Sequence, residues 1–191
     1  MAATAIDTHH IPARPSVLRS LFSFPDPVNE VSARVVAAGV VALSLAAIAL
    51  ASPLLRVLLA YGFVARVLTG PTLSPLGQLA TRVVTPRLGF AAKPVAGPPK
   101  RFAQAIGVLF SVSSAVLALG FGETVGADLV LGALIMAAIL ESAFGLCLGC
   151  KVFAQAMRAG LIPADVCERC NDIWAGRDLQ IHQDGPKGNI P

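Results

Sequence analysis

Four long apolar runs, set apart by short polar or proline-rich stretches, organise the hydrophobicity pattern of the chain. The shortage of charged residues is concentrated in these runs, which points to a bilayer rather than to a large soluble core. A helix needs about 20 apolar residues to cross a bilayer. The pattern therefore predicts an all-α fold, an integral membrane four-helix bundle. The expected spans are residues 31–51, 53–68, 102–122 and 126–150.

The first two runs differ in how they start and in how far they reach. Asp26-Pro27 precedes the first run, and a capping carboxylate followed by proline predicts that a helix begins there. The second run, Pro53–Leu68, covers only about 24 Å at 1.5 Å per residue. Arg56 and Arg66 lie near its two ends, where long side chains can reach the membrane surface, so a short or tilted span is tolerable.

The stretch between the second and third runs is rich in proline, glycine and basic residues. Within it, Leu76, Leu79, Val83 and Val84 recur at roughly helical spacing, with polar residues between them. We therefore expect a short amphipathic linker helix at about 74–84 that lies on the membrane surface.

Composition and charge agree with a membrane protein. Hydrophobic residues make up 55% of the chain and charged residues only 14%, whereas a soluble domain carries about a quarter charged residues. The sequence has no basic stripe interleaved with aromatic residues, so it gives no indication of a nucleic-acid partner. The apolar runs make the lipid bilayer the expected environment.

The placement of basic residues predicts the orientation. Every lysine and arginine except Arg56 falls on one side of the four-span arrangement. Because basic residues accumulate in cytoplasmic loops, both termini are expected in the cytoplasm. The chain then divides into a cytoplasmic tail at 1–26, a membrane domain at 27–150 and a short, partly helical cytoplasmic tail at 151–191.

All four cysteines of the chain form two C-x-x-C pairs, Cys147/Cys150 and Cys167/Cys170, at the cytoplasmic face of the expected arrangement. The cytoplasm is reducing, so permanent structural disulfides are disfavoured. The spacing suits a structural zinc site made of four thiolates, which would make the protein a non-enzymatic scaffold or complex subunit. The alternative is a pair of reactive dithiols.

The local environment bears on the dithiol interpretation in both directions. Lys151 and Arg169 adjoin one cysteine of each pair, which favours the thiolate form. However, Cys147 is expected at the C-terminal end of the fourth span, where the helix dipole disfavours negative charge. Neither pair is expected to open a helix, as the cysteines of thioredoxin-like proteins do. Both interpretations of the cysteines stay open.

Glu141 is the one acidic residue deep inside an apolar run. An ionisable group in the membrane needs a partner, and Arg66 is expected at a matching depth, so we predict a buried Glu141–Arg66 ion pair. In a regular helix Glu141 would lie about 180° from Cys150, which excludes direct proton exchange with both thiols. A structural role for Glu141 is therefore favoured. A small transporter that uses Glu141 is a further hypothesis, and it ranks below the two that involve the cysteines.

Several segments resemble a known protein family. The sequences PVNE, GPTLSPLGQLATRVVTPRL, PPKRFAQAIG and ESAFGLCLGCKVF are similar to those of an uncharacterised bacterial four-span membrane family, domain of unknown function 4395. The likeness covers roughly Asp26 to Ile173. It implies a multi-pass protein of the bacterial plasma membrane and supplies no catalytic residues. The family's loose association with thioredoxin- and sulfurtransferase-like proteins favours thiol chemistry.

The favoured function is a membrane-embedded thiol-redox or sulfur-relay protein. Cys147/Cys150 would exchange electrons or sulfur with Cys167/Cys170, and then with a thioredoxin- or sulfurtransferase-like soluble partner or within a larger membrane complex.

Metal content and thiol counts separate the two cysteine interpretations. If the cysteines form dithiols, oxidation of the purified protein should convert four titratable thiols into two disulfides without bound metal. One zinc per chain that disappears in the Cys167→Ser variant would instead establish the structural zinc site.

Overall fold

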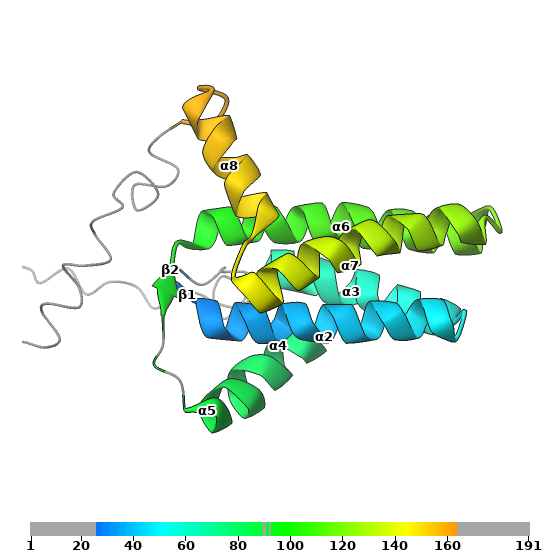
Figure 1. Ribbon diagram of the computed structural model, residues 1–191, viewed down its shortest axis with the longest axis horizontal. Coiled ribbons are helices and arrows are strands. Elements are labelled where there is room, and N and C mark those ends of the chain that lie inside the picture. Colours follow the sequence, from blue (N-terminus) through cyan, green and yellow to red (C-terminus); the bar gives the residue numbers. More distant parts are fainter. Residues whose placement is uncertain (1–25, 90, 92, 164–191) are drawn as a thin grey trace, which may run out of the picture.

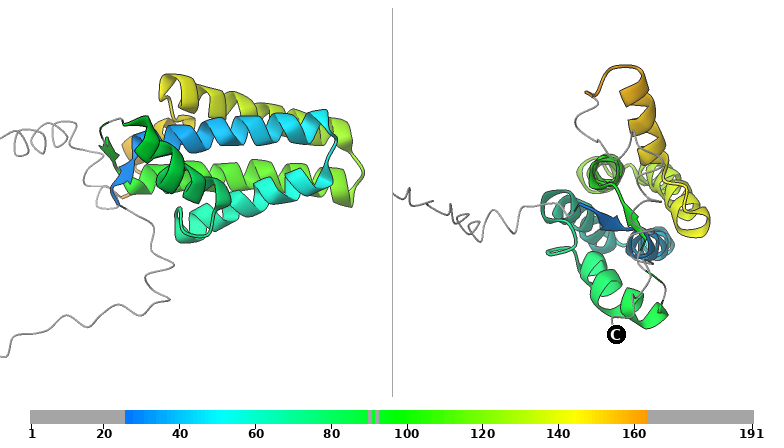
Figure 2. Two further views of the ribbon diagram at one scale, coloured as in Figure 1. Left: turned by 90° about the horizontal axis from the view of Figure 1, so that it is seen from below. Right: turned by 90° about the vertical axis from the view of Figure 1, so that its left-hand side faces the viewer.

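The computed structural model describes residues 26–89, 91 and 93–163, and in this part of the chain the fold is helical. Helices α2, α3, α6 and α7 lie side by side along the long axis of the molecule (Figures 1 and 2). Shorter elements gather at one end of them. The elements are β1 (Val28–Asn29), α2 (Glu30–Ala49), α3 (Pro53–Thr69), α4 (Pro75–Gln78), η1 (Leu79–Val84), α5 (Thr85–Leu88), β2 (Pro94–Val95), α6 (Gly97–Gly120), α7 (Thr124–Phe144) and α8 (Leu148–Arg158).

Helix α2 begins later than Asp26-Pro27 predicts. Its N-cap is Asn29, whose side chain accepts a hydrogen bond from the Val31 N–H at 3.0 Å. Asp26 instead accepts a hydrogen bond from the Gly97 N–H, at the start of α6. Antiparallel pairing of β1 with β2 fixes the same two chain segments beside each other. The carboxylate therefore joins two helix starts rather than capping one, which the local sequence could not indicate.

Helices α3 and α6 start where serine or proline favours a first turn. Ser52 caps α3, with Pro53 as the first helical residue, in agreement with the predicted start at 53. Helix α6 starts at Gly97, earlier than the predicted 102, because its first turn includes prolines that need no N–H partner. The basic residues of this turn therefore belong to the helix rather than to the preceding loop.

The fourth apolar run is two helices, not the single span predicted for 126–150. Gly145 has a φ of 68°, a left-handed conformation that glycine adopts without strain and that ends α7 at Phe144. Arg34 donates hydrogen bonds to the Ser142 and Ala143 carbonyl oxygens at 3.1 and 2.8 Å, which satisfies groups that the ended helix leaves open. Helix α8 then leaves in a new direction (Figure 1).

The helices pack with small and hydroxyl-bearing residues inside and large apolar residues outside. Ser44 and Ser114 are fully buried, whereas Leu54, Leu109 and Leu129 are all more than two-thirds exposed. Water would make this arrangement unfavourable, whereas lipid favours close packing of small residues between helices. Among the described residues, α2, α6 and α7 are long and apolar enough to cross a bilayer. The chain is thus a helical membrane protein.

Helix α3 has 17 residues and lies beside the three spanning helices. It packs mainly against α6. Its outward side chains, such as Leu54, Val57 and Leu68, are apolar and exposed. A fourth membrane span at 53–68 remains a prediction.

The linker helix predicted at 74–84 is present and continues to Leu88, as α4, η1 and α5 in succession. It packs against α2 at an angle and slopes away from it toward α5 (Figure 1). A Cβ atom on Gly39 would lie 3.0 Å from a methyl group of Leu76, and the hydroxyls of Ser32 and Thr85 are hydrogen-bonded at 3.0 Å. The apolar residues of the linker therefore partly cover α2.

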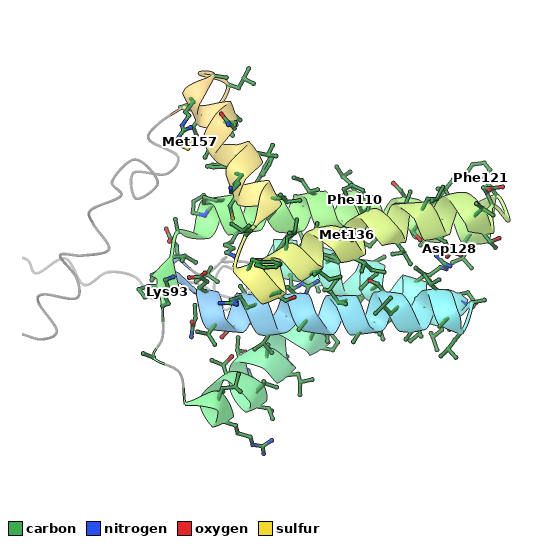
Figure 3. The ribbon with its side chains drawn as sticks, viewed as in Figure 1. Lys93, Phe110, Phe121, Asp128, Met136 and Met157 are labelled. Atoms are coloured by element: carbon green, nitrogen blue, oxygen red, sulfur yellow. The ribbon has the colours of Figure 1, made fainter. Side chains whose placement is uncertain are left out.

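The ion pair of Arg56 and Asp128 lies at one end of the long axis of the molecule. Arg56 is 4% exposed and pairs with Asp128 at the end of the molecule opposite Lys93 (Figure 3). Arg56 also donates to the Ser114 hydroxyl at 2.9 Å, and Ser114 donates to the Ala127 carbonyl at 3.0 Å. This network satisfies the one arginine that the sequence places away from the other basic residues.

The close approach of α3 and α6 at Gly107 generates a stability prediction. A Cβ atom at Gly107 would lie 2.2 Å from the Phe63 ring. Gly107→Ala should lower the free energy of unfolding by about 1–3 kcal/mol, the usual cost of overpacking. Thermal unfolding of the detergent-solubilised protein measures this change. The control is Gly132→Ala, where the new methyl group meets nothing within 4 Å. It should be neutral or stabilising by up to about 1 kcal/mol. Equal effects of both substitutions would contradict the packing.

Candidate functional site

The first C-x-x-C pair opens helix α8. Cys147 is the N-cap residue, with extended backbone angles, and Cys150 lies in the first turn. Both are free thiols. The expectation that Cys147 lies at a helix C-terminus is therefore wrong, because Gly145 ends α7 before the cysteines. The positive end of the α8 dipole, rather than a negative end, faces the pair, and that favours a thiolate.

Contacts between α8 and α6 hold the pair in place. A Cβ atom on Gly149 would lie 2.5 Å from the Ala103 Cα, so glycine is required for the two backbones to approach. The rings of Phe102 and Phe153 pack with their centroids 5.6 Å apart. The backbones of α6 and α8 thus approach closely at Gly149, whereas Gly145 ends α7. As a result Cys147 is only 8% exposed.

The pKa values of the two thiols are shifted in opposite directions. A hydrogen bond from the Cys150 thiol lowers the pKa of Cys147, and the Lys100 ammonium acts in the same direction. Burial and the Glu141 carboxylate oppose this shift without reversing it. The same hydrogen bond, reinforced by burial, raises the pKa of Cys150. Cys147 is therefore the more readily deprotonated of the two cysteines, and Cys150 is the one that keeps its proton and donates it in the hydrogen bond.

Glu141 has a different partner from the one expected. Its Oε1 accepts a hydrogen bond from Lys100 Nζ at 2.6 Å, and the two side chains are 22% and 9% exposed. Arg66 lies near enough to interact with the Glu141 charge. However, no guanidinium nitrogen of Arg66 has a hydrogen-bond partner among the described residues. The direct Glu141–Arg66 pair is replaced by Lys100, because α6 starts early enough to bring its first turn beside the last turn of α7.

The helix break also removes the geometric separation of Glu141 from the cysteines. Glu141 belongs to α7 and the cysteines to α8, so the angle expected in one regular helix does not apply. The carboxylate influences the pKa of both Cys147 and Cys150. Lys100 and Glu141 thus form one electrostatic unit with the cysteine pair.

A cavity of about 470 Å³ lies between the helices and is lined by the groups described above. Its polar lining comes from four different helices or helix starts. The polar residues from these helices are Arg66, Lys100, Gln104, Glu141 and Cys147, and Asn29, Ser32 and Thr81 add further polar groups to the lining. Apolar side chains of α2, α3, α6 and α7 make most of the remaining wall. The charged residues lie in the last turns of α3 and α7 and the first turn of α6, so they mark one end of the cavity.

Sequence reasoning missed Lys100 and Gln104. The available signal was their spacing with Ala103 and Gly107, which places all four on one face of a helix. That face was incomplete because the predicted span began at 102 and left Lys100 in the preceding loop. Recognising a helix that begins at the paired prolines would have placed a lysine inside the bundle.

The zinc interpretation depends on residues outside the described part of the chain. Cys167 and Cys170 lie there, as does most of the tail at 151–191. Among residues 26–89, 91 and 93–163, no group of three or more His, Cys, Asp or Glu side chains could hold a metal ion. Cys147 and Cys150 alone supply two of the four ligands of a closed zinc site.

Comparison with known proteins gives a family match. The family model described as Domain of unknown function (DUF4395) matches residues 28–158, which include all the described helices. No curated protein matches the chain. No solved structure matches it.

The Lys100–Glu141 pair predicts a double-mutant effect. Lys100→Met leaves the half-buried carboxylate without its partner and should lower the free energy of unfolding by about 2–4 kcal/mol. Adding Glu141→Leu should recover most of that loss, because the uncompensated charge is removed. The control is Lys93→Met: Lys93 pairs with Glu30 but is 73% exposed, so its loss should cost less than about 1 kcal/mol. Additive single effects in the double variant would argue against the pair.

Proposed function

We propose that this chain, which belongs to the family of Domain of unknown function (DUF4395), is a membrane-embedded thiol-redox or sulfur-relay protein that works through Cys147 and Cys150. The observation that carries the proposal is the position of the pair at the start of α8, with Cys150 donating to Cys147. A nucleophilic cysteine requires a thiolate, and a resolving cysteine is best kept protonated until it is needed.

The proposed exchange follows from these two acidities. The Cys147 thiolate attacks one sulfur of a partner's disulfide, and the partner's other sulfur leaves as a thiolate. Cys150 then loses its proton and attacks the Cys147 sulfur, which releases the partner's second thiolate and leaves a Cys147–Cys150 disulfide. Two electrons pass to the partner, whose sulfurs take up the protons. Lys100 would stabilise the thiolates that form beside it.

A sulfur relay would use the same nucleophile. The Cys147 thiolate attacks the outer sulfur of a donor persulfide, so that Cys147 becomes the persulfide and the donor leaves as a thiolate. In either version, Cys167/Cys170 would serve as the second pair that exchanges with the first. A thioredoxin- or sulfurtransferase-like protein would be the soluble partner. We also propose that both termini lie in the cytoplasm and that the cysteine pair lies at the cytoplasmic face of the plasma membrane.

Alkylation of individual cysteines at a series of pH values tests the proposal. Only the thiolate reacts, so the reaction rate of Cys147 with iodoacetamide should reach half its maximum at a pH below that of an ordinary cysteine. Cys150→Ala removes the donor and should raise this midpoint by about 1–2 pH units, since a hydrogen bond to a charged group contributes about 1.5–3 kcal/mol. Mass spectrometry of the labelled peptides measures each cysteine separately.

Two lysine substitutions, one beside the cysteine pair and one exposed, provide a test and its matched control. Lys100→Met should raise the Cys147 midpoint, because Lys100 favours the thiolate. Lys151→Met, a substitution of an exposed lysine, should change it little. The proposal is wrong if Cys147 titrates no lower than Cys150. It is equally wrong if no Cys147–Cys150 disulfide forms in any thiol–disulfide buffer.

A further inference from the structure

We propose that the cavity beside Cys147 binds an organic monoanion, whose carboxylate docks on Arg66 and whose apolar body fills the space between the helices. This inference goes beyond the thiol chemistry and does not depend on it. It rests on a buried cation without a partner, on the charge of the cavity and on the nature of its walls.

Arg66 is the central observation. It is 2% exposed, and its Nε and both Nη atoms make no hydrogen bond to any described residue. Its contact is a stack on the Phe63 ring, with the guanidinium carbon 4.3 Å from the ring centroid. A guanidinium cannot lose its charge in a protein, and a buried charge without hydrogen bonds is costly. Its planar fork of donors matches the two oxygens of a carboxylate.

The charges of the cavity select a monoanion. Arg66 and Lys100 are cationic, and Glu141 is anionic and hydrogen-bonded to Lys100. Because Glu141 is hydrogen-bonded to Lys100, Arg66 is the cation of this cavity that has no hydrogen-bonded counter-charge among the described residues. A single negative charge on the ligand would neutralise it, whereas a dianion would bring a second charge into an apolar space with no cation to pair with it.

The remaining walls select an apolar body. Phe63, Phe110, Val40 and Leu134 line the cavity. Its volume of about 470 Å³ lies within the range of ~300–1,000 Å³ that is typical of small-molecule sites. A carboxylic acid with an aliphatic or aromatic body satisfies the cation and the apolar wall together.

The primary test uses benzoate and its neutral isostere benzamide on the full-length protein in detergent. Cys147 lines the same cavity and serves as the reporter. At a benzoate concentration about ten times its dissociation constant, alkylation of Cys147 by a small neutral reagent should slow about tenfold, because only the unliganded fraction reacts. Benzoate should also raise the unfolding temperature, whereas benzamide should do neither.

Substitution of Arg66 supplies the second arm. Arg66→Met should abolish the benzoate effects and should leave the ligand-free protein at least as heat-stable as the wild type, because a desolvated charge has been removed. Arg66→Lys should bind more weakly, since it keeps the charge without the fork. Arg82→Met removes an exposed arginine outside the cavity and should behave as the wild type.

Acids of different length distinguish a soluble ligand from a membrane fatty acid. Stronger protection by hexanoate than by hexadecanoate would identify a soluble acid, and the reverse order would identify a lipid-derived one. The proposal is overturned if benzoate and benzamide act equally, or if benzoate changes neither the alkylation rate nor the unfolding temperature of the wild type. These comparisons need only the wild-type protein, so they hold even if an Arg66 variant fails to fold.

Discussion

The left-handed backbone at Gly145 is the constraint on which this end of the molecule depends. With a φ of 68°, it ends α7 before the cysteines and turns the chain into α8. Had the helix continued, Cys147 would lie at a C-terminal end, where the dipole opposes a thiolate. Because the helix ends, Cys147 becomes the N-cap of a new helix. The same residues therefore experience the opposite electrostatic environment.

Compensation of buried charge organises the neighbouring helices. Lys100 and Glu141 pair across α6 and α7, and the pair acts electrostatically on both cysteines. At the opposite end, Arg56 is satisfied by Asp128 and a serine hydroxyl. Arg66 departs from this pattern among the buried basic residues described here, because its nitrogens have no hydrogen-bond partner. In an apolar environment such a group is a reason to look for a ligand.

The helical class and the membrane character could be predicted from apolar runs alone, and the expected runs at 31–51, 102–122 and the first part of 126–150 overlap most of the three helices long enough to span a membrane. The residues at which α2 and α6 start could not be predicted from the local sequence. Asp26 was available as a cap, but a backbone N–H distant in sequence, that of Gly97, is its partner. Local capping patterns cannot distinguish these uses, since both satisfy the same oxygen.

The candidate site was predictable only in part. The cysteine pair and Glu141 stood out by type and spacing, but the partner of Glu141 did not. Depth matching favoured Arg66, and it brought that residue into the right region. Lys100 forms the pair because the α6–α7 packing places its ammonium against the carboxylate. Matching depth restricts position along one axis and leaves the direction of each side chain undetermined.

By itself, the sequence determined that this chain builds long apolar helices and carries an unusual grouping of thiols and buried charge. The length and hydrophobicity of each segment determine whether it forms such a helix, independently of the helices it packs against. Only the tertiary structure decided where the last helix breaks, which cation meets Glu141, and that a cavity with an unpartnered guanidinium lies beside Cys147. Those outcomes depend on contacts between helices distant in the chain, whose free energies no single segment encodes.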